Sequence, residues 1–154
     1  MNVAKRALAA ILVTAGATAG GAAATGAPAH ASPWHPDGPR LLVVAPGVVH
    51  QHTPQWVQAY WLGTETVCDF RLTADAPGVD VGYPANTATY TSFYRNASLD
   101  RLEPDRTALH LEAHRAGTLP LRLHMAYTHR AADGTCGTKV RHHDLTVRLS
   151  VLPA

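Results

Sequence analysis

The sequence has no pattern that identifies a catalytic nucleophile or a cofactor-binding loop. Its few serines, Ser32, Ser92, Ser98 and Ser150, all lie outside the Gly-x-Ser-x-Gly pattern that exposes a nucleophile at a strand-to-helix turn. No glycine-rich loop of the kind that holds nucleotide phosphates is present. The chain is therefore predicted not to be an enzyme, and no cofactor is expected.

Long hydrophobic runs are also missing. The apolar run 7–15 is much shorter than the ~20 residues that cross a bilayer as a helix. With the preceding Lys5 and Arg6 and the small residues that follow, it has the layout of a secretory signal peptide. Residues 1–31 are predicted to be removed, cleavage before His30 being the alternative, and the mature protein is predicted to be extracellular with no membrane span.

Concentrated positive charge is absent from the predicted mature chain. The whole sequence has 13 basic and 11 acidic residues, and removal of Lys5 and Arg6 with the signal peptide makes the two totals equal. Proteins that bind nucleic acid or anionic membranes need a basic surface. No nucleic-acid partner is therefore expected.

Cysteine is scarce, since Cys68 and Cys136 are the only two in the chain. An exported protein meets an oxidising environment, in which a lone pair of cysteines is expected to be linked. No Cys-x-x-Cys spacing favours a redox role instead. The sequence therefore predicts one disulfide, between Cys68 and Cys136.

Residues 32–40 are rich in proline and glycine and are predicted to form an N-terminal arm. Residues 41–154 then contain short β-branched and aromatic runs separated by turn residues, with no long apolar repeat of helical period. This pattern predicts an all-β domain of about seven antiparallel strands in two packed sheets, a barrel being the alternative. The expected strands are 41–49, 56–62, 65–73, 79–83, 87–94, 107–113, 119–129 and 139–152, two of which are expected to merge.

The alternation of side chains predicts which faces of these strands are buried. Every second residue is apolar between Leu119 and Tyr127, and residues 145–151 repeat the pattern. Because successive side chains in a strand point to opposite faces, each run has one core face. Cys68 shares its phase with Phe70 and is therefore predicted to point inward.

Two segments carry a resemblance to a known family. Gly63-Thr64-Glu65-Thr66-Val67-Cys68-Asp69-Phe70-Arg71-Leu72-Thr73-Ala74-Asp75-Ala76-Pro77-Gly78-Val79 resembles the second and third strands of bacterial secreted immunoglobulin-like modules. Residues 102–109 resemble a later turn and strand of these modules. The resemblance spans residues 41–152 and implies an immunoglobulin-like β-sandwich that acts as a spacer, adhesive or binding unit. This sequence departs from the family in standing alone and in its many histidines.

One histidine cluster is a candidate metal site. His110, Glu112 and His114 fall on one face of the expected strand 107–113 and its end, because Leu109 and Leu111 take the other face. Two imidazoles and a carboxylate are ligands that suit zinc or copper. The alternative interpretation is a solvated outer strand face that binds no metal.

Aromatic residues offer a second kind of site. Trp56, Tyr60, Tyr90 and Tyr94 are candidates for an exposed patch, which would stack on sugar rings or on a partner's side chains. The alternative is that most aromatic rings pack between the sheets. The sequence thus predicts a secreted, non-catalytic module that recognises a protein or a cell-surface glycan, with a zinc- or copper-binding protein as the alternative.

Overall fold

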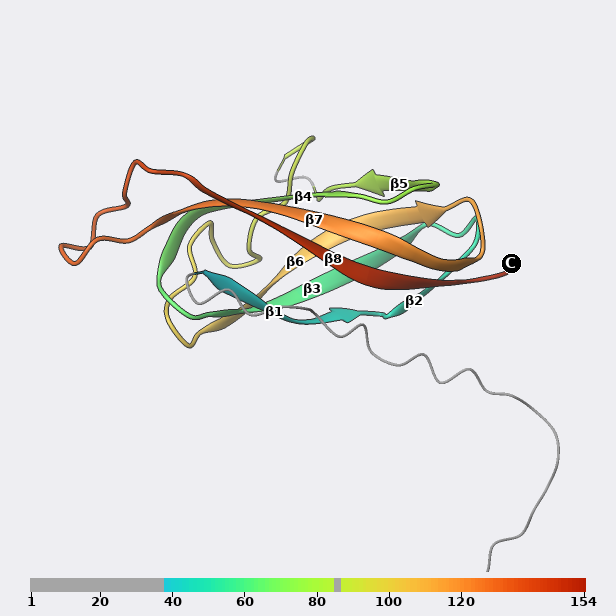
Figure 1. Cartoon of the computed structure of the whole chain (residues 1–154), viewed down its shortest axis with the longest axis horizontal. Helices are drawn as coiled ribbons and strands as arrows, with labels where there is room; N and C mark the ends of the chain where they lie inside the picture. Colours follow the sequence, from blue (N-terminus) through green and yellow to red (C-terminus); the bar gives the residue numbers. More distant parts are fainter. Residues whose placement is uncertain (1–37, 85–86) are drawn as a thin grey trace, which may run out of the picture.

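A computed structural model describes residues 38–84 and 87–154. The predicted signal peptide and residues 32–37 of the predicted arm lie outside this part of the chain. The described residues form two four-stranded sheets, ordered β1-β3-β6-β5 and β2-β8-β7-β4 (Figure 1). The strands are β1 (Pro39–Ala45), β2 (Val48–His50), β3 (Gln55–Gly63), β4 (Val67–Asp75), β5 (Val79–Gly82), β6 (Pro104–Ala113), β7 (Gly117–His129) and β8 (Arg141–Leu152).

The all-β prediction is confirmed, and the alternation of apolar residues explains which strand faces are buried. In β7 every second side chain from Leu119 to Tyr127 is buried, whereas Arg122 on the opposite face is exposed. Val147 and Val151 are buried in the same way on β8. These strands therefore follow the predicted inward phase.

The core lies between the two sheets and is centred on aromatic rings. The ring of Trp61 on β3 lies 5.6 Å from that of Phe70 on β4, and Phe93 stacks on Phe70 at 4.1 Å. Trp61 is fully buried and donates its indole N–H to Thr107 Oγ1 at 3.0 Å. Burial of a large apolar side chain of this kind contributes about 1.5–3 kcal/mol.

The predicted disulfide between Cys68 and Cys136 is confirmed, with a Cα–Cα distance of 5.9 Å. Cys68 is buried on β4, as its phase predicted. Cys136 lies in the exposed connection between β7 and β8, which projects beyond one end of the sheets (Figure 1). The bond therefore fixes this connection to a core strand.

The first expected strand, 41–49, is wrong as one continuous element. The chain leaves the first sheet after Ala45 and enters the second at Val48, with Pro46 and Gly47 between the two strands. β1 pairs antiparallel with β3, whereas β2 pairs parallel with β8. This division gives eight strands in place of about seven, and the β2–β8 pair departs from the predicted antiparallel pattern.

The expected strand 87–94 is also wrong. Thr91 exchanges two backbone hydrogen bonds with Leu72 on β4, and three residues later the Tyr94 N–H donates to Arg106 O on β6. The segment therefore crosses from one sheet to the other. It is too short at either sheet to form a continuous ladder. No helix in residues 38–84 and 87–154 has the length and apolar character needed to cross a membrane.

Candidate functional site

The outer face of the first sheet carries the most exposed aromatic side chains of the predicted patch. β3 and β6 pair in a register that places Trp56 opposite His110 and Tyr60 opposite Arg106. Trp56 is 51% exposed, and its ring lies 4.9 Å from that of His110. Polar and aromatic side chains therefore lie side by side on the outer face of β3 and β6, while the opposite face of these strands packs in the core.

Tyr94 joins this face from the segment that crosses between the sheets. Its backbone N–H donates to Arg106 O at 2.8 Å, which brings its ring beside the β6 side chain. The Arg106 guanidinium carbon lies 4.4 Å from the Tyr94 ring centroid, and Tyr94 is 73% exposed. A stacked guanidinium and a phenol ring thus stand together at the surface.

A hollow of about 410 Å³ opens at this point, lined by Tyr60, Tyr94, Arg95, Pro104, Asp105 and Arg106. We call it the Arg106 hollow. Gln58 adjoins it: its Oε1 accepts hydrogen bonds from Tyr60 OH at 2.9 Å and from Arg106 Nη1 at 3.2 Å. These contacts fix the Arg106 side chain from the sheet side.

The other charges of the Arg106 hollow have partners within the protein. Arg95 forms an ion pair of 2.6 Å with Glu103. Asp105 accepts hydrogen bonds from the backbone N–H groups of Arg95 at 3.3 Å and of Arg106 at 2.7 Å. Among the described residues, no carboxylate forms an ion pair with the Arg106 guanidinium.

The predicted aromatic patch is divided by the fold. Trp56 and Tyr60 lie on β3 of the first sheet. Tyr94 lies in the segment that crosses between the sheets and is hydrogen-bonded to β6 of the same sheet. Tyr90 instead lies beside Arg71 of β4, whose guanidinium carbon is 5.1 Å from the Tyr90 ring centroid. It lines a separate hollow of about 310 Å³ with residues of the second sheet.

Of the predicted metal-binding residues, His110 has a different neighbour from Glu112 and His114. His110 faces Trp56, and the His114 Nε2 lies 2.9 Å from Asp80 Oδ2. Glu112 is paired in register with Asp80 on β5. His110 and His114 are four residues apart along an extended chain, which separates their Cα atoms by about 13 Å. Residues 38–84 and 87–154 contain no group of three or more His, Cys, Asp or Glu side chains placed to hold a metal.

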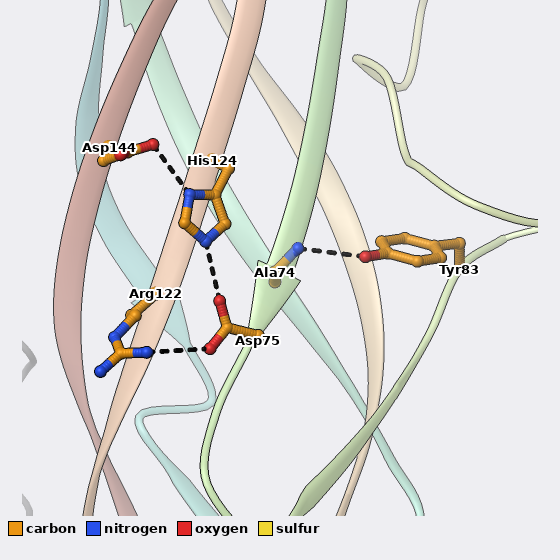
Figure 2. Close-up of polar contacts among 6 residues, drawn as sticks. All are labelled: Ala74, Asp75, Tyr83, Arg122, His124 and Asp144. Atoms are coloured by element: carbon orange, nitrogen blue, oxygen red, sulfur yellow. Dashed lines mark hydrogen bonds and ion pairs between the residues drawn. The ribbon is translucent and has the colours of Figure 1, made fainter.

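A charged cluster that the sequence did not reveal lies on the outer face of the second sheet (Figure 2). His124 on β7 places Nε2 2.7 Å from Asp75 Oδ1 and Nδ1 2.8 Å from Asp144 Oδ1. Arg122 adds a longer ion pair, 3.5 Å from Asp75. These hydrogen bonds, first to Asp75 and then to Asp144, raise the pKa of His124 above 6.5.

This cluster joins three strands but brings no nucleophile with it. Asp75 ends β4 and Asp144 belongs to β8, so the charges meet through the pairing of β4, β7 and β8. The only sequence signal was the outward phase of Arg122 and His124 on β7. Their partners are 49 and 20 residues away from His124, so only the register brings them together.

The described residues thus form an all-β, disulfide-linked domain of two four-stranded sheets. No family model matches the chain, and no curated protein matches it. A solved structure of AvmM, described as catalysing macrocyclization in alchivemycin A biosynthesis, aligns with 75% of this chain and 89% of its own. The identity is 12% and the TM-score is 0.36, values that carry no argument about fold or activity.

Proposed function

We propose that this chain is a secreted, non-catalytic binding module that recognises a surface glycan through the outer face of the β1-β3-β6-β5 sheet. The observation that carries the proposal is the Arg106 hollow. There the 73% exposed ring of Tyr94 stands beside a half-buried arginine. Aromatic rings at the surface stack on sugar rings, and adjacent polar groups hydrogen-bond to their hydroxyls.

We also propose that the fold is an immunoglobulin-like sandwich. Support comes from the strand order. If β1 and β2 are two halves of the first strand, the orders β1-β3-β6-β5 and β8-β7-β4 correspond to the A-B-E-D and G-F-C sheets of a seven-stranded immunoglobulin domain. The disulfide departs from that pattern, because it joins β4 to the β7–β8 connection. Antibody domains instead link the second and sixth strands.

The composition of the outer face favours a glycan over a flat protein contact. Trp56 and Tyr60 lie four residues apart on β3, with Gln58 between them on the same face. Their Cα atoms are therefore about 13 Å apart, far enough for the two rings to contact different sugar units of one extended chain. A row that alternates rings with hydrogen-bonding groups matches a polymer whose units alternate apolar faces with hydroxyls.

Binding to insoluble polysaccharides and to purified cell walls tests this proposal. The expected result is retention of the wild-type protein, with affinity weakened about fivefold by Trp56→Ala or Tyr94→Ala, since each loses a stacking contact worth on the order of 1 kcal/mol. Tyr90→Ala is the matched control because it removes an aromatic ring beside the other sheet. Equal retention of all variants, or binding only to a protein component of the walls, would overturn the glycan proposal.

A further inference from the structure

We propose that the Arg106 hollow selects saccharides that carry a carboxylate, with Arg106 as the residue that binds it. This inference rests on the proposed glycan-binding function and names the class of sugar. The observation behind it is the surroundings of the Arg106 guanidinium group. Arg106 is half-buried and held in place, yet no carboxylate of the described residues neutralises it.

The side chain is fixed without the use of most of its donors. Gln58 accepts one hydrogen bond from Arg106 Nη1 at 3.2 Å, and the Tyr94 ring contacts one face of the group. A guanidinium has five N–H donors in a rigid planar fork, of which this contact uses one. A carboxylate matches the remaining fork with two parallel hydrogen bonds.

Among the described residues, the carboxylates that line or adjoin the hollow form no ion pair with the Arg106 guanidinium. Arg95 is paired with Glu103, and the Asp105 carboxylate is hydrogen-bonded by two backbone N–H groups. Asp105 keeps its negative charge, because neutral N–H donors stabilise a carboxylate without cancelling its charge. A singly charged uronic acid therefore meets less repulsion in the hollow than a doubly charged phosphate would. A neutral sugar would leave the Arg106 charge without a partner.

The size and walls of the hollow suit a sugar ring attached to that carboxylate. Its volume of about 410 Å³ lies within the usual range of small-ligand sites, about 300–1,000 Å³. Tyr94, from the crossing segment, and Tyr60, from β3, both line the hollow. Tyr60 OH is already oriented by Gln58 and retains acceptor capacity for a sugar hydroxyl.

Calorimetric titration with uronate polymers tests the inference. Polygalacturonate, alginate and hyaluronan are compared with their methyl-esterified forms, which keep the same rings but block the carboxylate. We expect at least one native polymer to bind ten- to a hundredfold more tightly than its ester, the range expected for hydrogen bonds to a charged group. The preference should shrink as salt is added.

Arg106→Gln is expected to abolish the preference for the acid form, while Arg106→Lys retains part of it because charge remains without the planar fork. Arg71→Gln is the matched control, since Arg71 also stacks on a tyrosine but lies on the other sheet. Thermal unfolding confirms that each variant is folded. An undiminished acid preference in Arg106→Gln, or tighter binding of the esters by wild type, overturns the inference alone. No binding of any polysaccharide overturns the proposed function as well.

Discussion

His124 Nε2 lies 2.7 Å from Asp75 Oδ1, and this contact joins β7 to β4 across the outer face of the second sheet. Asp144 holds the other ring nitrogen from β8. Both ring nitrogens donate at once only in the protonated imidazole. The three strands are therefore linked by a charge that depends on pH.

Stability is expected to depend on the protonation of His124. Its folded pKa is raised above the ordinary value of 6.5, mainly by the hydrogen bonds to Asp75 and Asp144. The folded state therefore binds the proton more tightly than the unfolded chain does. The stabilisation is fully present below pH 6.5 and is lost as the pH rises through the folded pKa.

Urea unfolding of wild type and His124→Gln at about pH 5.5 and about pH 8.5 measures this effect. The free energy of unfolding should differ more between the two proteins at the lower pH. Because the cluster is exposed, added salt should reduce the difference. His142→Gln on β8 serves as control. A gap between wild type and His124→Gln that stays constant with pH contradicts the prediction.

The two tryptophans of β3 are expected to have opposite roles. Trp61 is fully buried and donates to Thr107, so Trp61→Ala should cost about 3–5 kcal/mol of unfolding free energy. Trp56 is 51% exposed, so Trp56→Ala should cost under about 1 kcal/mol while weakening glycan binding. Denaturant melts and polysaccharide binding on both variants check this. Similar unfolding losses in both would argue against the assigned faces.

Removal of the disulfide is expected to lower stability. The bond closes a loop between residues 68 positions apart, and loss of such a cross-link typically costs about 2–5 kcal/mol. The double variant Cys68→Ala, Cys136→Ala should therefore unfold at lower urea concentration. Its glycan binding should persist where the protein is folded, because the Arg106 hollow lies on the other sheet. Loss of binding in folded protein would contradict this separation.

Zinc or copper binding by His110, Glu112 and His114 stays a prediction that equilibrium dialysis can decide. If the chain is a zinc- or copper-binding protein, it should bind about one metal ion, and His110→Ala should abolish this binding. The separate contacts of His110 with Trp56 and of His114 with Asp80 lead us to expect no stoichiometric uptake. A metal that is retained and that depends on His110 would reinstate the alternative.

The start of the mature chain remains to be measured, since residues 1–37 lie outside the described part of the chain. Intact-mass spectrometry of protein secreted by its own host should give a chain beginning at Ser32. A chain that begins at His30 would instead carry an amine and an imidazole on one residue, a pair able to chelate copper. Retention of residues 1–31 would contradict the signal-peptide prediction.

Local patterns predicted much of the fold. The alternation of apolar residues around Leu121 and Val147 identified the core faces of β7 and β8, because successive side chains of a strand point to opposite faces. Cys68 and Cys136 were paired correctly because no other cysteine competes. The break after Ala45 was missed, since apolar residues continue on both sides of it.

The candidate sites depend on contacts that no local pattern encodes. Tyr94 reaches Arg106 only because the segment before it crosses between the sheets, where a strand had been expected. His124 meets Asp75 and Asp144 through the register of three strands. Trp56 and Tyr60 share a face of β3 because an even number of residues separates them, whereas Tyr90 was grouped with them only by residue type.

The position of β8 bears on when the domain can fold. It is the last of the eight strands in the chain, yet it lies inside its sheet, with β2 on one side and β7 on the other. Until it has been synthesised, the earliest residues of that sheet, those of β2, have no neighbour to pair with. Such dependence on distant contacts delays folding. The second sheet is therefore completed only by the last strand of the chain, whereas β1, β3, β5 and β6, which form the sheet of the Arg106 hollow, all precede it.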